Sequence, residues 1–289
     1  MARATNRIRA TAAPSRSRRA FPRTPRSRRA PNRLPNPAGL RLRLQWTKAV
    51  SAKQWDTYRD AINALRRARI DFLVGGGFAL AAYTGRWRNT KDIDLYIRAS
   101  DRQAAIRALA RAGFQDYFGK LPYDRKWIYR STRSGVIVDV IWAMANQRAR
   151  VDDHWFARAT PMSLKGEPLL LLPLEEFVWC KLYILQRDHC DWTDVMNVLY
   201  AAGKQMDWTW LLKRLEDDWP VLKALLTLYA WVCPGRAREL PAGLRSRMEL
   251  DGAAREETGS ACSTHAGGSP LCCLPTNRSR SERVCSSAP

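Results

Sequence analysis

The chain has 289 residues, of which 46% are hydrophobic and 26% charged, a balance that supports a hydrophobic core and excludes a wholly disordered or fibrous protein. The net charge is +22, but residues 1–45 hold 13 arginines and no acidic residue, and charges cancel in 251–289, so 46–250 carry only +9. The longest apolar runs fall well short of the ~18 residues that cross a bilayer, and no apolar leader is visible. We therefore expect a cytoplasmic protein without a membrane span.

Both ends of the chain lack apolar periodicity. Residues 1–45 repeat Arg, Ser, Pro and Ala, and residues 251–289 are rich in Gly, Ser, Thr, Cys and Pro, so we expect two disordered tails. The basic tail has two interpretations: a solvated segment or reading frame that starts too far upstream, or an arm that binds polyanions. The seven cysteines are odd in number and form no CxxC pair, which indicates neither a disulfide framework nor a zinc site.

Between the tails, the pattern predicts an α/β (α+β) fold: a core with a small mixed sheet over 46–160, followed by a helical C-terminal part over 161–250. Ser100 and Gln103 form a capping-box pattern at the start of one core helix. The predicted core elements, in chain order, are a helix over 51–68, a strand over 70–74, a helix over 78–83, a strand over 92–97, a helix over 100–113, and a hairpin of strands over 126–130 and 136–142. The predicted helices of the C-terminal part span 174–187, 192–202, 208–217 and 220–231.

Three carboxylates lie in the predicted strands. Asp92 and Asp94 are two residues apart, so their side chains share one face of the strand and repel each other unless a cation lies between them. Asp139 interrupts the apolar strand over 136–142, where an ionised side chain without a partner is costly to bury. If the two strands are neighbours, the three acids form a cluster of oxygen ligands suited to Mg²⁺.

A glycine turn joins the strand over 70–74 to the next helix. Such a turn lets backbone N–H groups approach a phosphate closely at a helix N-terminus. Gly76 and Gly77 are the candidate phosphate-binding pair, although the register Gly75-Gly76 stays open. The basic side chains that follow the turn are candidates for further phosphate contacts: Arg86, Arg88 and Lys91.

Lys181 falls on the apolar stripe of the helix over 174–187. Its ammonium either reaches a bound nucleotide or extends to solvent along the helix surface. Further on, Asp191 and Asp194 lie at the start of the next helix, where carboxylates cap free N–H groups and interact favourably with the helix dipole.

Taken together, the segment from Val74 to Phe78, the Asp92-Ile93-Asp94 strand and the later Asp139 resemble the nucleotidyltransferases with a DNA polymerase beta-like catalytic core. Gly-Gly-Phe-Ala-Leu followed by Arg-Asn-Thr-Lys-Asp-Ile-Asp-Leu is similar to bacterial members that include toxin-like proteins. The resemblance covers roughly 70–240. It implies that Lys181 contacts the triphosphate, and that Asp191 and Asp194 orient this lysine or an acceptor.

The sequence thus predicts a Mg²⁺-dependent nucleotidyltransferase that moves a nucleoside monophosphate from a nucleoside triphosphate to an RNA, protein or small-molecule acceptor. Asp92 and Asp94 would bind both metal ions, and Asp139 would bind one and accept the proton of the attacking hydroxyl. Gly76, Gly77, Arg88 and Lys181 would bind the nucleotide. The alternative is a catalytically inactive module of the same fold that binds nucleic acid or an antitoxin partner.

Overall fold

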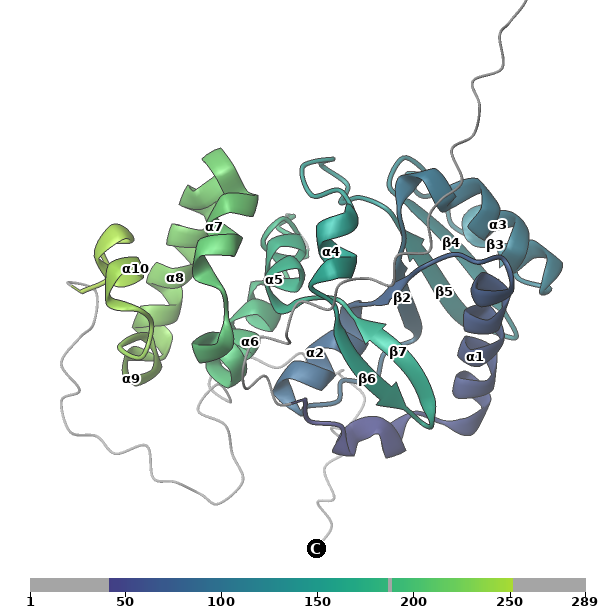
Figure 1. Ribbon diagram of the computed structural model, residues 1–289, viewed down its shortest axis with the longest axis horizontal. Helices are drawn as coiled ribbons and strands as arrows, with labels where there is room; N and C mark the ends of the chain where they lie inside the picture. The colour runs from purple at the N-terminus through teal and green to yellow at the C-terminus, as the bar shows by residue number, and fades with distance from the viewer. Residues whose placement is uncertain (1–41, 187–188, 252–289) are drawn as a thin grey trace, which may run out of the picture. The chain divides into compact units, whose positions relative to one another are not determined.

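The computed structural model describes residues 42–186 and 189–251 (Figure 1). Apart from residues 42–45 and Asp251, the two segments expected to be disordered lie outside this part of the chain. Within the described residues, no helix is long and apolar enough to span a bilayer.

One mixed sheet of seven strands forms the core of the described part, in the order β3-β4-β5-β2-β1-β7-β6 (Figure 1). The strands are β1 (Leu73–Val74), β2 (Asp92–Tyr96), β3 (Gln115–Asp116), β4 (Ile128–Arg133), β5 (Val136–Ile141), β6 (Thr160–Leu164) and β7 (Glu167–Leu171). The pairs β2–β5 and β1–β7 are parallel, and the other neighbours are antiparallel. The predicted α/β class, with a mixed sheet followed by helices, is confirmed.

The helices of the described part are α1 (Ala52–Arg67), α2 (Gly76–Thr84), α3 (Arg102–Arg111), α4 (Asp153–Ala157), α5 (Leu174–Leu182), α6 (Trp192–Ala202), α7 (Trp208–Leu215), α8 (Trp219–Val232), α9 (Pro234–Ala237) and α10 (Ala242–Arg247). The seven predicted helices occur in the predicted order, and the three short helices α4, α9 and α10 were not predicted from the sequence. The buried stripe of α1 contains Trp55, Tyr58, Ile62 and Leu65, as its three- and four-residue spacing predicts. The division of 46–250 at residue 160 stays a prediction.

Several helix bounds differ from the sequence prediction, among them the start of α3 and the end of α5. The helix α3 begins after Asp101 and not after Ser100, because residues 99–101 first form a 3₁₀ turn, so no capping box forms. The helix α5 ends at Leu182, whereas the sequence predicted a helix that continues to residue 187. The chain leaves the helix at Tyr183, and Leu185 then pairs with Cys190 in an isolated bridge.

The hairpin β6–β7 was not expected from the sequence. Its turn places Lys165 and Gly166 at φ of 48° and 85°, the left-handed conformations that match the twist of two-residue hairpins. The strand β7 pairs with β1 through Val74 and Leu171, and the N–H of Leu172 donates to the carbonyl of Val74 at 2.9 Å. This pairing anchors the start of α5 beside the strand that leads into the glycine turn.

Candidate functional site

The three predicted carboxylates come together on one face of the sheet. In the parallel pair β2–β5, Asp94 lies opposite Asp139, and Asp92 precedes Asp94 by one full strand period. Ile93, which points to the other face, is fully buried in the core. The sequence expectation that these two strands are neighbours is therefore met, and the side chain of Asp139 is only 1% exposed.

Arg130 is the partner of the buried Asp139. It lies opposite Asp139 in the antiparallel pair β4–β5. Its Nε donates to the two carboxylate oxygens at 2.8 and 3.1 Å, and its Nη2 donates to Oδ2 at 2.5 Å. The same Nη2 lies 4.0 Å from Oδ2 of Asp92. Sequence reasoning missed Arg130, because only the register of the hairpin shows which residue of β4 faces Asp139.

Burial and mutual repulsion disfavour the ionised forms of Asp94 and Asp139. Burial raises the pKa of Asp94 to about 8, and the charges of Asp92 and Asp139 add to the shift, while Lys181 and Arg130 oppose it. Burial also raises the pKa of Asp139 above its usual range, although Arg130 acts in the opposite direction. A cation bound between these side chains would favour their ionised forms.

The glycine turn touches the acid cluster directly. Gly75 is the N-cap residue of α2, and its N–H donates to the carbonyl of Asp94 at 2.9 Å. Gly76 has a φ of 52°, and a Cβ at this position would lie 1.6 Å from Oδ2 of Asp94. A Cβ at Gly75 would meet the ring of Tyr96 at 2.3 Å. The register that the sequence left open is thus a capping Gly75, with Gly76 and Gly77 in the first turn of α2.

The loop before β2 holds Asp92 from the side. The hydroxyl of Thr90 donates to Oδ1 of Asp92 at 2.5 Å, and a Cβ at Gly77 would lie 3.2 Å from the Cβ of Thr90. Gln54 of α1 in turn donates to the carbonyl of Thr90 at 3.4 Å. The start of β2, the glycine turn and α1 therefore meet at the acid cluster.

Lys181 lies in a second charged group formed by α5, α6 and the loop after α2. Its ammonium pairs with Asp191 and lies 3.2 Å from Oδ2 of Asp194. Burial disfavours the charged ammonium, but the carboxylates of Asp194 and Asp191 outweigh it, so the pKa of Lys181 lies above its ordinary value. Asp191 is the N-cap residue of α6, yet its side chain makes no capping bond.

Arg88 completes this group. Its two terminal nitrogens each donate to one oxygen of Asp194 at 3.2 Å, a bidentate pair in which Arg88 stays 61% exposed and Asp194 is only 5% exposed. Asp94 is among the carboxylates that raise the pKa of Lys181, which relates this group to the acid cluster. Asp194 therefore joins Arg88 to Lys181, two of the side chains predicted to bind nucleotide.

The sequence profile of a family described as "uncharacterised nucleotidyltransferase" matches residues 21–232. The chain belongs to this family. The resemblance drawn from the glycine turn and the three aspartates is confirmed at this level. A comparison with curated proteins finds no significant match.

Several solved structures are similar to this nucleotidyltransferase. The antibiotic-resistance factor ANT(2'')-Ia, in its solution structure, is 18% identical, with a TM-score of 0.36 over 69% of this chain and 95% of that one. The lincosamide antibiotic adenylyltransferase LnuA, bound to lincomycin, is 15% identical, with a TM-score of 0.37 over 52% and 96% of the two chains. JHP933 from Helicobacter pylori is 13% identical, with a TM-score of 0.35 over 71% and 94%.

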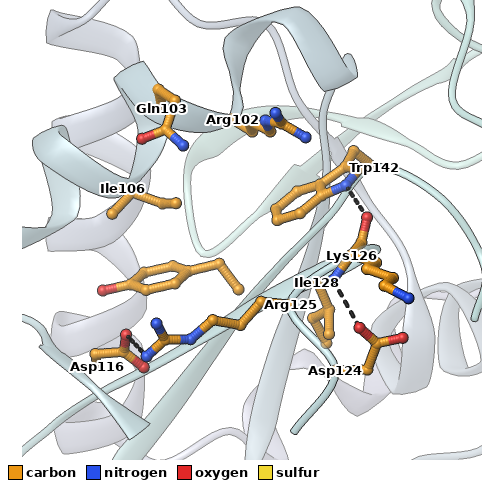
Figure 2. Close-up of a pocket in the computed structure, with 10 residues that line it drawn as sticks. Arg102, Gln103, Ile106, Asp116, Asp124, Arg125, Lys126, Ile128 and Trp142 are labelled. Carbon is orange, nitrogen blue, oxygen red and sulfur yellow. Dashed lines mark hydrogen bonds and ion pairs between the residues drawn. The ribbon is translucent and has the colours of Figure 1, made fainter. Parts of the chain in front are cut away.

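A hollow of about 560 Å³ is lined by residues of α3 and β4. Tyr129, which alternates along β4 with Arg130, lines it. Figure 2 shows Arg102 and Gln103 of α3 on one side and the ion pair of Asp116 with Arg125 on the other. None of the predicted site residues of this nucleotidyltransferase lines the hollow.

Proposed function

We propose that this nucleotidyltransferase transfers a nucleoside monophosphate from a nucleoside triphosphate to an acceptor hydroxyl. The contact between Gly76 and Asp94 carries the proposal, because it brings a phosphate-binding helix N-terminus next to carboxylates that can bind a metal ion. The N-terminus of α2 offers backbone N–H groups and a partial positive charge to a phosphate. The adjacent carboxylates offer oxygen ligands to the cation that such a phosphate carries.

The donor set fits Mg²⁺. Among the described residues, no group of three or more His, Cys, Asp and Glu side chains is already arranged as a metal site, and Asp139 is engaged by Arg130. Asp92 and Asp94 nevertheless present carboxylates on one strand face, and a bound cation would relieve the repulsion from Asp92 and Asp139 that adds to the effect of burial on the pKa of Asp94. These two residues would hold both ions, and Asp139 one. Bound Mg²⁺ supplies charge neutralisation for the triphosphate and the leaving pyrophosphate.

Other groups of this chain would bind the triphosphate and take up the proton of the acceptor. The backbone of Gly76 and Gly77 would hold the triphosphate at the start of α2. Asp139, held in orientation by Arg130, would accept the proton of the acceptor hydroxyl. The oxygen of that hydroxyl would bond to the α-phosphorus while the bond from this phosphorus to pyrophosphate breaks. Lys181 and Arg88 would contact the triphosphate from the opposite side, oriented by Asp194 and Asp191.

A labelling experiment tests the proposed transfer and identifies the class of acceptor. Purified protein is incubated with each α-labelled nucleoside triphosphate and Mg²⁺, together with total RNA, with protein extract or with a small-molecule fraction. We expect label in one acceptor pool, released pyrophosphate, and loss of both in Asp94→Asn. Absence of transfer and of triphosphate binding, combined with RNA binding that falls steeply with salt, would instead establish a non-catalytic nucleic-acid-binding module.

A further inference from the structure

Tyr58 carries a buried hydroxyl without a hydrogen-bond partner in the described part of the chain. The residue is 1% exposed and lies on the core-facing stripe of α1. Its ring packs edge-on against Phe78 of α2, with centroids 5.7 Å apart. Phenylalanine would fill this space equally well, and a buried hydroxyl that donates to nothing is costly. The hydroxyl of Tyr58 therefore remains available as a hydrogen-bond donor.

The surroundings of this hydroxyl relate it to the acid cluster. Tyr58 lies one helical turn after Gln54, on the face of α1 that contacts Thr90 beside Asp92. After burial, the charges that raise the pKa of Tyr58 above its ordinary value belong to Asp92 and Asp94. The phenol thus stays protonated and can donate to an ionised carboxylate.

Asp92 has room for a second donor. Its Oδ1 accepts from Thr90 at 2.5 Å, whereas the nearest cation to Oδ2 is Nη2 of Arg130, at 4.0 Å. Carboxylates that bind a metal ion are held in orientation by hydrogen bonds from residues outside the metal's own ligands. We propose that Tyr58 is a positioning residue whose hydroxyl donates to the carboxylate of Asp92 when a divalent cation binds there. This inference rests on the proposed function, because it needs a cation at Asp92 and Asp94.

The test compares two buried tyrosines. Mn²⁺ binding to the otherwise intact chain is measured by electron paramagnetic resonance for wild type, Tyr58→Phe and Tyr83→Phe, and urea unfolding is measured without metal. Tyr83 is 2% exposed, but its hydroxyl donates to the carbonyl of Leu172, away from the acid cluster. It is thus a matched control for the loss of a buried phenol.

We expect Tyr58→Phe to bind Mn²⁺ about tenfold more weakly than wild type while its metal-free stability is equal or higher. Tyr83→Phe should show the reverse: unchanged Mn²⁺ affinity and lower stability. Equal Mn²⁺ affinity in Tyr58→Phe and wild type would overturn the role of Tyr58 alone, as would a metal-free stability as low as that of Tyr83→Phe. A wild-type protein that binds no Mn²⁺ would overturn the proposed metal site, and the inference with it.

Discussion

Gly76 and Asp94 are in such close contact that no side chain fits between them: a Cβ on Gly76 would lie 1.6 Å from Oδ2 of Asp94. This contact brings the N-terminus of α2 against the acid cluster. A side chain at position 76 would be unfavourable for two reasons: the residue has a φ of 52°, and the carboxylate of Asp94 occupies the space that a Cβ needs.

Gly76→Ala should destabilise the protein by more than Gly135→Ala. Gly135 also has a positive φ, of 79°, but nothing lies within 4 Å of a Cβ there. The control should therefore lose only the left-handed penalty of about 1–2 kcal/mol, whereas the Gly76 variant must also displace Asp94. Urea unfolding measures both, and calorimetry should show weaker triphosphate binding in Gly76→Ala only. Equal losses in the two variants would contradict the contact.

Asp94→Asn should be more stable than wild type at pH 8 in the absence of metal. A carboxyl whose pKa rises from 3.8 to about 8 on folding binds its proton more tightly in the folded state. Its contribution therefore lowers stability progressively as the pH rises between those values. The gain in Asp94→Asn should be largest at pH 8 and should vanish near pH 4. Thermal unfolding across this range, with and without Mg²⁺, checks it, since Mg²⁺ should stabilise wild type alone.

Arg130→Met should unfold more easily than wild type, because it leaves the carboxylate of Asp139 buried without its partner. Removing one member of a buried ion pair costs about 3–5 kcal/mol, and the lower end applies because Arg130 is 31% exposed. The double variant Arg130→Met/Asp139→Leu should recover part of the loss. A double-mutant cycle by urea unfolding measures the coupling, and additive effects would show that the two side chains do not interact.

Lys181→Met should weaken triphosphate binding by about 1–3 kcal/mol, the range for a lost charge-assisted hydrogen bond. Lys204→Met is the control, because Lys204 is 62% exposed and pairs with Glu239. Calorimetry at low salt compares the two. Equal affinity in Lys181→Met and wild type would mean that the lysine only neutralises Asp191 and Asp194.

Glu176→Gln should flatten the pH dependence of stability between pH 4.5 and about 7. Burial raises the pKa of Glu176 from 4.5 to about 7 although Trp210 donates to its Oε1 at 2.7 Å. A folded-state pKa above the unfolded value means that stability falls as the pH rises through this window. Glu249→Gln, at a side chain 78% exposed, should keep the wild-type slope. An identical slope in Glu176→Gln would show that Glu176 is ionised throughout.

Local patterns in the sequence determined the longer helices, the principal strands and the shared face of Asp92 and Asp94, but not the short helices α4, α9 and α10. The reason is that side chains repeat every 3.6 residues in a helix and every two in a strand, whatever the rest of the chain does. The bounds predicted for the helix over 192–202 match α6, and those for α1 differ by one residue at each end. The glycine turn and its junction with a helix were likewise visible, because glycine adopts the positive φ of Gly76 without a steric cost.

Only the tertiary structure decided which charges meet. Arg130 faces Asp139 through the register of a hairpin, and Asp194 joins Arg88 to Lys181 although Arg88 and Asp194 are 106 residues apart in the chain. The hairpin β6–β7 also escaped prediction, since its apolar residues give no distinct strand period and its place beside β1 depends on a parallel pairing far along the sequence. Strand order and register are non-local properties: burial of the whole sheet sets them, and no single segment contains enough of the interacting surface to specify them.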